Sequence, residues 1–131
     1  MRQWAEEHQL TLEILRVFHV YGEGELETRF WPSLRRAALA GEDFPMTKGE
    51  QIRDFQPVEA VASAFLRRAI DTTSSHNFLI HNLGSETPMS IEEFARAWWS
   101  TWNARGCLIV GDLPYREAEV MRYVPKPDLL I

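Results

Sequence analysis

Three arginines lie at positions where a predicted strand meets a loop or another element. Arg16 lies within an apolar run, Arg53 stands where a short extended segment meets a helix start, and Arg116 follows an apolar strand through a Pro-Tyr loop. The ends of strands in α/β proteins face the ligand crevice. A guanidinium is suited to a diphosphate, and each charge-assisted hydrogen bond contributes about 1.5–3 kcal/mol. Arg53 and Arg116 are therefore candidate diphosphate ligands.

Purely structural roles compete with this interpretation. Arg53 can pair with Asp54 or Glu59, and Arg116 can pair with Glu119, without any ligand. The histidines have no metal-ligand spacing with carboxylates, so they are interpreted as surface or hydrogen-bonded residues. These are His8, His19, His76 and His81.

The tryptophans and glycines allow similar alternatives. Trp98 and Trp102 have helical spacing and are predicted to lie in the core rather than form a stacking platform, which leaves Trp99 lateral or at an interface. Gly22 and Gly24 are spaced like the first two glycines of a dinucleotide fingerprint, but position 27 is Glu. A phosphate-binding glycine loop is therefore not predicted here.

Composition narrows the class of protein. The chain has 131 residues and a net charge of −5, which favours one domain or less and argues against binding to nucleic acid. Its single cysteine, Cys107, indicates a reducing compartment. The longest uncharged apolar stretch, Ala60 to Leu66, is far shorter than the ~20 residues that span a bilayer. We expect a soluble cytoplasmic protein that binds no membrane and no metal.

The order of the predicted elements is α/β. We expect the last turns of a helix at 2–9, one buried strand over 10–20, buried strands at 78–83 and 107–110, and two short extended segments forming a small hairpin at 44–47 and 51–55. The three main helices are expected as follows. The first begins near Phe30 and ends at Gly41, and the third begins at the Ser90–Glu93 capping box. The second begins after Pro57, and its apolar face is formed by Val58, Val61, Ala62, Phe65 and Ala69.

Few strands make a poor parallel sheet, since both faces of such a sheet must be covered. Both ends of the chain therefore look cut from a larger sheet. We expect exposed strand edges and self-association through them.

Four motifs together resemble the extended short-chain dehydrogenase/reductase family, the NAD-dependent nucleotide-sugar epimerases, dehydratases and reductases. They follow one another in the family's order and cover nearly the whole chain. The motifs are LRVFHVYG at 15–22, QIRDF with VEAVA at 51–62, NLGS with PMS at 82–90, and PYR with Glu119 at 114–119. The run at 113–123 looks most like the deoxysugar reductases of surface-polysaccharide synthesis.

The resemblance implies a carboxyl-terminal portion of a Rossmann-type enzyme that holds a nucleotide-diphosphate sugar. Arg53 and Arg116 would clamp the diphosphate, and Glu119 would act toward the ribose. The nucleobase would lie against the segment that contains Phe44, Met46 and Thr47. His19 would face the diphosphate or the sugar in place of the family's usual Asn. Phe18 would lie beside the nicotinamide of NAD or NADP.

The family's chemical machinery is missing from this sequence. Tyr21, Tyr115 and Tyr123 are not followed by Lys four positions later, so none matches the family's Tyr-x-x-x-Lys. Without that lysine a tyrosine is a poor acid–base group near neutral pH. We therefore expect no catalytic residue in this chain and no tight binding of NAD or NADP.

Three interpretations follow. The first is that residues 1–131 are the substrate-binding part of such an enzyme, without its amino-terminal dinucleotide-binding part and inactive alone. The second is a stand-alone nucleotide-sugar-binding or regulatory module without catalysis. The third is a truncated product with structure but no function. The nucleobase, the sugar and the reaction type stay open.

Overall fold

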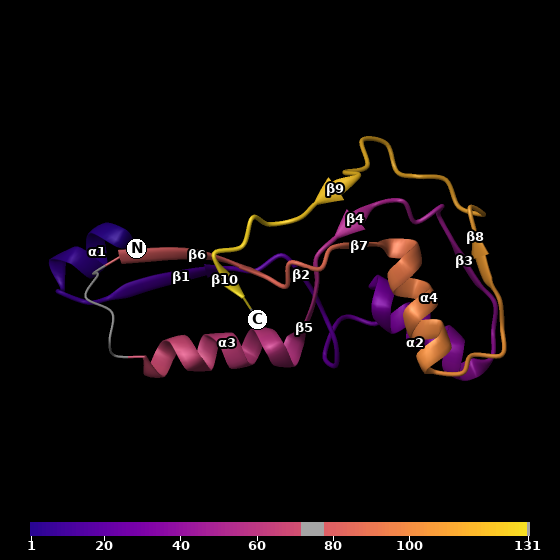
Figure 1. Cartoon of the computed structure of the whole chain (residues 1–131), viewed down its shortest axis with the longest axis horizontal. Coiled ribbons are helices and arrows are strands. Elements are labelled where there is room, and N and C mark those ends of the chain that lie inside the picture. Colours follow the sequence, from indigo (N-terminus) through magenta and orange to yellow (C-terminus); the bar gives the residue numbers. More distant parts are fainter. Residues whose placement is uncertain (72–77, 131) are drawn as a thin grey trace.

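The computed structural model describes residues 1–71 and 78–130. Two packed regions lie at opposite ends of an elongated molecule, and short strands join them (Figure 1). The described elements combine helices with mainly parallel strand pairs, which confirms the predicted α/β class.

The first region is a small parallel sheet with one helix beneath it (Figure 1). Strand β6 (Phe78–Gly84) pairs in parallel with β1 (Leu12–Arg16) on one side and with β10 (Leu129–Leu130) on the other. Helix α1 (Arg2–Glu7) precedes β1, and α3 (Val58–Ile70) buries Val61 and Ala64 in a core with Leu83.

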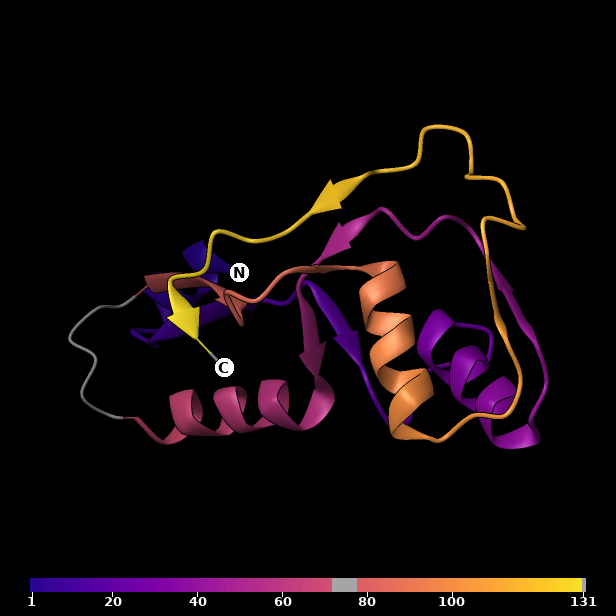
Figure 2. The same cartoon turned by 45° about the vertical axis from the view of Figure 1, so that its right-hand side comes forward.

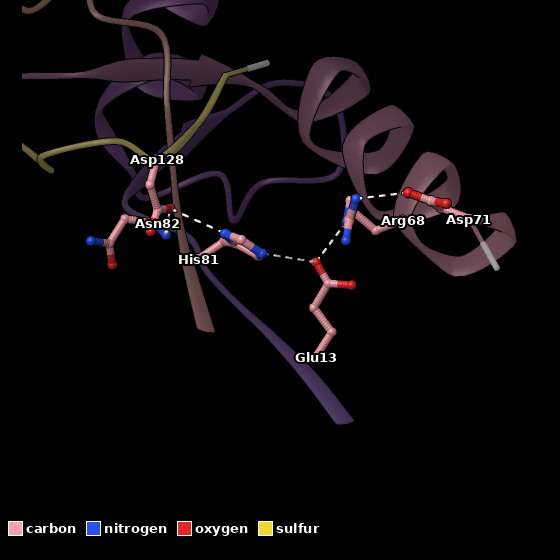
Figure 3. A network of polar contacts seen from close by, with 6 residues as sticks. All are labelled: Glu13, Arg68, Asp71, His81, Asn82 and Asp128. Atoms are coloured by element: carbon pink, nitrogen blue, oxygen red, sulfur yellow. Dashed lines mark hydrogen bonds and ion pairs between the residues drawn. The ribbon is translucent and has the colours of Figure 1, made fainter. Parts of the chain in front are cut away.

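A network of polar side chains lies between α3, β1 and β6 in this region (Figure 3). Arg68 Nε donates to Glu13 Oε1 at 2.6 Å, and the His81 Nε2 atom lies 3.5 Å from the same oxygen. Asp128 Oδ1 lies 3.5 Å from His81 Nδ1 and accepts from the Asn82 backbone N–H at 2.7 Å. The network links α3, β1 and β6 to the chain before β10. His76 lies outside the described residues.

The second region packs two helices beside a pair of strands. Helix α2 (Phe30–Ala40) ends at Gly41, whose φ of 72° is left-handed and favours glycine, and α4 (Ile91–Thr101) packs against α2. Strands β3 (Phe44–Met46) and β8 (Leu108–Val110) pair in parallel.

Tryptophans and phenylalanines fill this second region. Trp98 and Trp102 pack against its core as predicted, and Trp99 Nε1 donates to the Gly106 carbonyl at 3.0 Å. The buried members of the two clusters are Trp31, Leu34, Met46, Phe55, Phe94 and Ala95.

Short strands connect the two regions (Figure 2). Strand β2 (His19–Tyr21) pairs in parallel with β5 (Phe55–Pro57). Strand β4 (Ile52–Arg53) lies between β7 (Met89–Ser90), which is antiparallel to it, and β9 (Arg122–Tyr123), which is parallel.

Two strand predictions were wrong. The single strand expected over 10–20 is two strands, because the chain changes partner between them: β1 joins β6, and β2 joins β5. The hairpin expected from 44–47 and 51–55 does not form, because β3 pairs with β8 while β4 pairs with β7 and β9. Each pairing is non-local, and alternation along one segment does not specify its partner.

The apolar face predicted for α3 is only partly correct. Val61 is buried, but Ala62 and Ala69 are exposed and the Phe65 side chain is 45% exposed, while Ala64 lies in the core. The helix carries apolar residues on two adjoining stripes, and the stripe that contains Ala64 and Arg68 faces the sheet.

The start of α4 supports a first prediction. Ser90 Oγ accepts from the Glu93 backbone N–H at 3.0 Å, and Glu93 Oε2 accepts from the Ser90 backbone N–H at 2.7 Å, which confirms the capping box. Replacing Ser90 by Ala should destabilise the protein by about 1 kcal/mol. Thermal unfolding measures this loss, and an equal loss for Ser100→Ala, a serine near the carboxyl end of the same helix, would contradict it.

The same capping box makes stability depend on pH. The Ser90 backbone and side-chain hydrogen bonds lower the pKa of Glu93 from its usual 4.5. A carboxylate with a lowered folded-state pKa stabilises the protein above its unfolded value, and this contribution is lost as the pH falls through the folded value. As the pH is lowered below 4.5, the denaturant midpoint should therefore fall less steeply in Glu93→Gln than in the unsubstituted chain. Parallel curves would contradict this.

Candidate functional site

A cavity of about 610 Å³ lies where the connecting strands meet the second packed region. All seven residues that the sequence assigned to substrate binding line it, although they come from separate parts of the chain. They are His19, Phe44, Met46, Thr47, Arg53, Arg116 and Glu119.

Alternation along β4 and β5 directs side chains to this cavity. Successive side chains of a strand point to opposite sides. Gln51, Arg53 and Phe55 line the cavity and are more than nine-tenths buried. Asp54 and Gln56 are fully buried away from it: Asp54 accepts hydrogen bonds from the Ser85 backbone and hydroxyl, and Gln56 Nε2 donates to the Leu83 carbonyl.

Arg53 is held in place from two directions. Its Nη2 donates to the Val120 carbonyl at 2.7 Å and to Glu119 Oε1 at 3.3 Å, and its Nη1 donates to the Ile52 carbonyl at 2.9 Å. Its ion pair is therefore with Glu119, not with Asp54 or Glu59. These bonds use three of the five N–H groups of a guanidinium, so two remain for a ligand.

Arg116 and Glu119 lie on the segment between β8 and β9, which covers one side of the cavity. Gly111 and Leu113 donate backbone N–H groups to the Met46 carbonyl at 3.0 and 3.2 Å, and the Tyr115 hydroxyl donates to Glu50 Oε2 at 2.9 Å. Arg116 is exposed and makes no ion pair within residues 1–71 and 78–130. It is therefore free to meet an anion at the cavity mouth.

His19 contributes a neutral imidazole to the cavity wall. Its ring lies edge-on to Phe55, with centroids 4.9 Å apart. Burial, with the positive charges of Arg53 and Arg29, lowers the pKa of His19 from its usual 6.5. At neutral pH the ring therefore offers one donor and one acceptor nitrogen.

This environment gives a second prediction. Replacing Arg53 by Met removes a nearby positive charge, so the pKa of His19 should rise toward 6.5. NMR titration of the His19 ring protons measures the shift, and identical midpoints in the two proteins would contradict it. Because the folded pKa is lowered, the unsubstituted protein should lose stability as the pH falls through 6.5 to the folded value.

The predicted nucleobase wall is mainly apolar. The Phe44 and Phe30 rings meet edge-on with centroids 5.8 Å apart, and Met46 is buried beside them. Thr47 Oγ1 accepts from the Gly49 backbone N–H at 3.2 Å. A flat, uncharged ring can pack against such a wall.

Phe18 does not share this cavity. Its ring is half-buried and packs at 5.4 Å from that of Tyr123. A nicotinamide role for Phe18 stays a prediction, and the sequence has neither the glycine fingerprint nor the Tyr-x-x-x-Lys that would hold NAD and act with it.

Sequence reasoning missed three polar residues of the wall. Glu25 Oε2, Trp31 Nε1 and Gln51 Oε1 are buried atoms that have no hydrogen-bond partner among the described residues, and all three residues line the cavity. Buried polar atoms are normally hydrogen-bonded. Of the three, Gln51 could have been found from the sequence. It stands two positions before Arg53, and side chains two positions apart in an extended segment point to the same side.

Tyr21 is a further polar residue of the wall. Burial and the nearby charge of Glu59 raise the pKa of Tyr21, so its hydroxyl stays protonated at neutral pH. Within the described ranges, no group of three or more His, Cys, Asp or Glu side chains is placed to hold a metal ion. A search of the same residues also finds no helix of the length and apolarity needed to cross a bilayer.

Comparison with solved structures defines the class of fold as that of Rossmann-type nucleotide-sugar enzymes. A UDP-N-acetylglucosamine 4-epimerase from Methanobrevibacter ruminantium M1 has a TM-score of 0.79 at 23% identity, over 97% of this chain and 41% of that one. MoeE5 in complex with UDP-glucuronic acid and NAD has a TM-score of 0.71 at 28% identity, over 89% of this chain and 38% of that one.

The sequence match is more specific. The chain belongs to the NAD dependent epimerase/dehydratase family, whose sequence model matches residues 1–84. CDP-abequose synthase from Salmonella typhimurium is 28% identical over 92 residues, which are 70% of this chain. The match spans 31% of the length of that relative.

Proposed function

We propose that this chain binds a nucleotide-diphosphate sugar in the cavity described above. The observation that carries the proposal is the convergence of Arg53 and Arg116 on one cavity whose wall continues into Phe44 and Met46. Two guanidinium groups suit a diphosphate, and the apolar wall suits a base. MoeE5 and a UDP-glucose 4-epimerase of the same fold were solved with UDP sugars.

The proposed role is that of the carboxyl-terminal, substrate-binding part of an NAD(P)-dependent epimerase, dehydratase or reductase of deoxysugar or surface-polysaccharide synthesis. We propose that residues 1–131 act in the cytoplasm and are inactive alone. The absence of Tyr-x-x-x-Lys and the match to 31% of CDP-abequose synthase support this role.

Isothermal titration with CDP-, UDP- and dTDP-sugars tests the proposal. We expect saturable binding of at least one of them, and weaker binding by Arg116→Met than by the control Arg105→Met, whose side chain is outside the cavity. If a folded sample binds none of the three, as judged by its circular dichroism, the site is not a nucleotide-sugar site.

A stand-alone binding module is the second candidate, because residues from separate parts of this chain line one cavity. The two candidates differ in self-association. β1 is an edge strand of its sheet, and α3 exposes Phe65, Leu66 and Ile70. Part of a larger enzyme should self-associate through these surfaces, whereas a module should form one defined species at all concentrations. Sedimentation velocity over a concentration series distinguishes them.

A further inference from the structure

Gln51 carries a buried hydrogen-bond acceptor that the protein leaves unused. The residue is 4% exposed, its Oε1 accepts no hydrogen bond from residues 1–71 and 78–130, and it lines the cavity. Such an acceptor is costly unless something donates to it. A donor on a ligand in the cavity would satisfy it.

The position of Gln51 along the chain indicates which part of a ligand it meets. Gln51 directly precedes β4 and, like Arg53, lines the cavity, and two residues of extended chain span roughly 6.5–7 Å. The apolar wall of Phe44 and Met46 precedes Gln51, whereas Phe55, which pairs with His19, follows Arg53. In sequence order, the residues that line the cavity therefore supply an apolar wall, then a hydrogen-bond acceptor and then a guanidinium group. A nucleoside diphosphate has the matching order of base, ribose and diphosphate.

We propose that Gln51 Oε1 accepts a hydrogen bond from a ribose hydroxyl and makes the site selective for ribonucleotides. This inference rests on the proposed function. Hydroxyl groups are the only donors that a ribose offers next to a diphosphate. The Glu119 carboxylate, to which the sequence assigned the ribose, pairs with Arg53 through Oε1 in this structure, whereas Gln51 Oε1, two positions before Arg53 in the sequence, is an acceptor that is unengaged among the described residues.

Gln56 provides a matched control. It is also a buried glutamine with an unpartnered Oε1, but it does not line the cavity and its Nε2 is bonded to the Leu83 carbonyl. Gln51→Met and Gln56→Met keep similar side-chain volumes and each remove one buried amide. Only the first should alter ligand selectivity.

The experiment compares UDP with its 2′-deoxy and 3′-deoxy analogues by titration calorimetry. The unsubstituted chain should bind UDP roughly 2- to 12-fold more tightly than at least one analogue, the range that one hydrogen bond of about 0.5–1.5 kcal/mol gives. In Gln51→Met this ratio should fall to about 1, and in Gln56→Met it should be unchanged.

Three outcomes would overturn the inference while the proposed function stands. The unsubstituted chain binds UDP and both analogues equally; Gln51→Met keeps the original ratio; or Gln51→Met instead loses discrimination between UDP-glucose and UDP, which would assign the residue to the hexose. The first outcome is measured on the unsubstituted chain alone, so the inference can be contradicted even if Gln51→Met does not fold. If the folded, unsubstituted chain binds no nucleoside diphosphate at all, the proposed function itself fails.

Discussion

Replacing Arg53 by Met should lower the affinity for a nucleoside diphosphate by about 100-fold or more. Two N–H groups of this guanidinium remain for a ligand, and each charge-assisted hydrogen bond to phosphate contributes about 1.5–3 kcal/mol. The side chain is 10% exposed and is already held by Glu119 and the Val120 carbonyl. Little ordering cost therefore opposes these bonds when the ligand binds.

Two further variants separate loss of charge from loss of geometry. Arg53→Lys keeps the positive charge but loses the planar fork, so it should bind with intermediate affinity. Glu119→Gln removes the carboxylate that competes for Arg53 and should retain binding. Circular dichroism and thermal unfolding must show that each protein is folded. Titration of Arg53→Met with an affinity within a few-fold of the unsubstituted chain would remove Arg53 from the site.

Replacing Phe94 by Ala should destabilise the protein by about 3–5 kcal/mol. The Phe94 side chain is 3% exposed, its ring stacks on that of Phe55 at 3.8 Å between centroids, and Tyr21 meets it edge-on at 4.9 Å. Truncation removes both aromatic contacts and leaves a void between α4 and β5. Because Phe94 also lines the ligand cavity, binding should weaken in parallel.

Phe65 on α3 is the matched control for this substitution. It is the same residue type within a helix, but its side chain is 45% exposed. Chemical denaturation should show that Phe65→Ala costs about 1 kcal/mol or less, since surface substitutions are usually mild. Equal losses for the two variants would contradict the position of the core between α2, α4 and β5.

Local signals in the sequence predicted the helices well. The Ser90–Glu93 capping box, Gly41 and Pro57 act within one turn of the element that they begin or end, so their effect can be read without knowing the fold. The partner of a strand cannot be read in this way. The pairing of β3 with β8 joins segments more than 60 residues apart, and neither segment specifies the other.

The candidate site residues that belong to family motifs could be predicted from the sequence. The contacts that depend on tertiary packing could not. The motifs placed Arg53, Arg116 and His19 among the candidates, and all three line one cavity. The ion pair of Arg53 with Glu119 depends on the path of the segment between β8 and β9, which no local pattern reveals. In the sequence, Trp31 cannot be distinguished from any other residue of an amphipathic helix. Only the folded structure shows that its indole N–H has no hydrogen-bond partner among the described residues.

The central claim is that Arg53 and Arg116 hold one diphosphate together. Its most direct test is calorimetric titration of UDP and uridine, which differ only in the diphosphate, against the unsubstituted chain, Arg53→Met, Arg116→Met and the double variant. We predict that the unsubstituted chain prefers UDP strongly, that each single variant loses part of this preference, and that the double variant loses nearly all of it. A preference that survives in full in both single variants, or its absence from the unsubstituted chain, would contradict the claim.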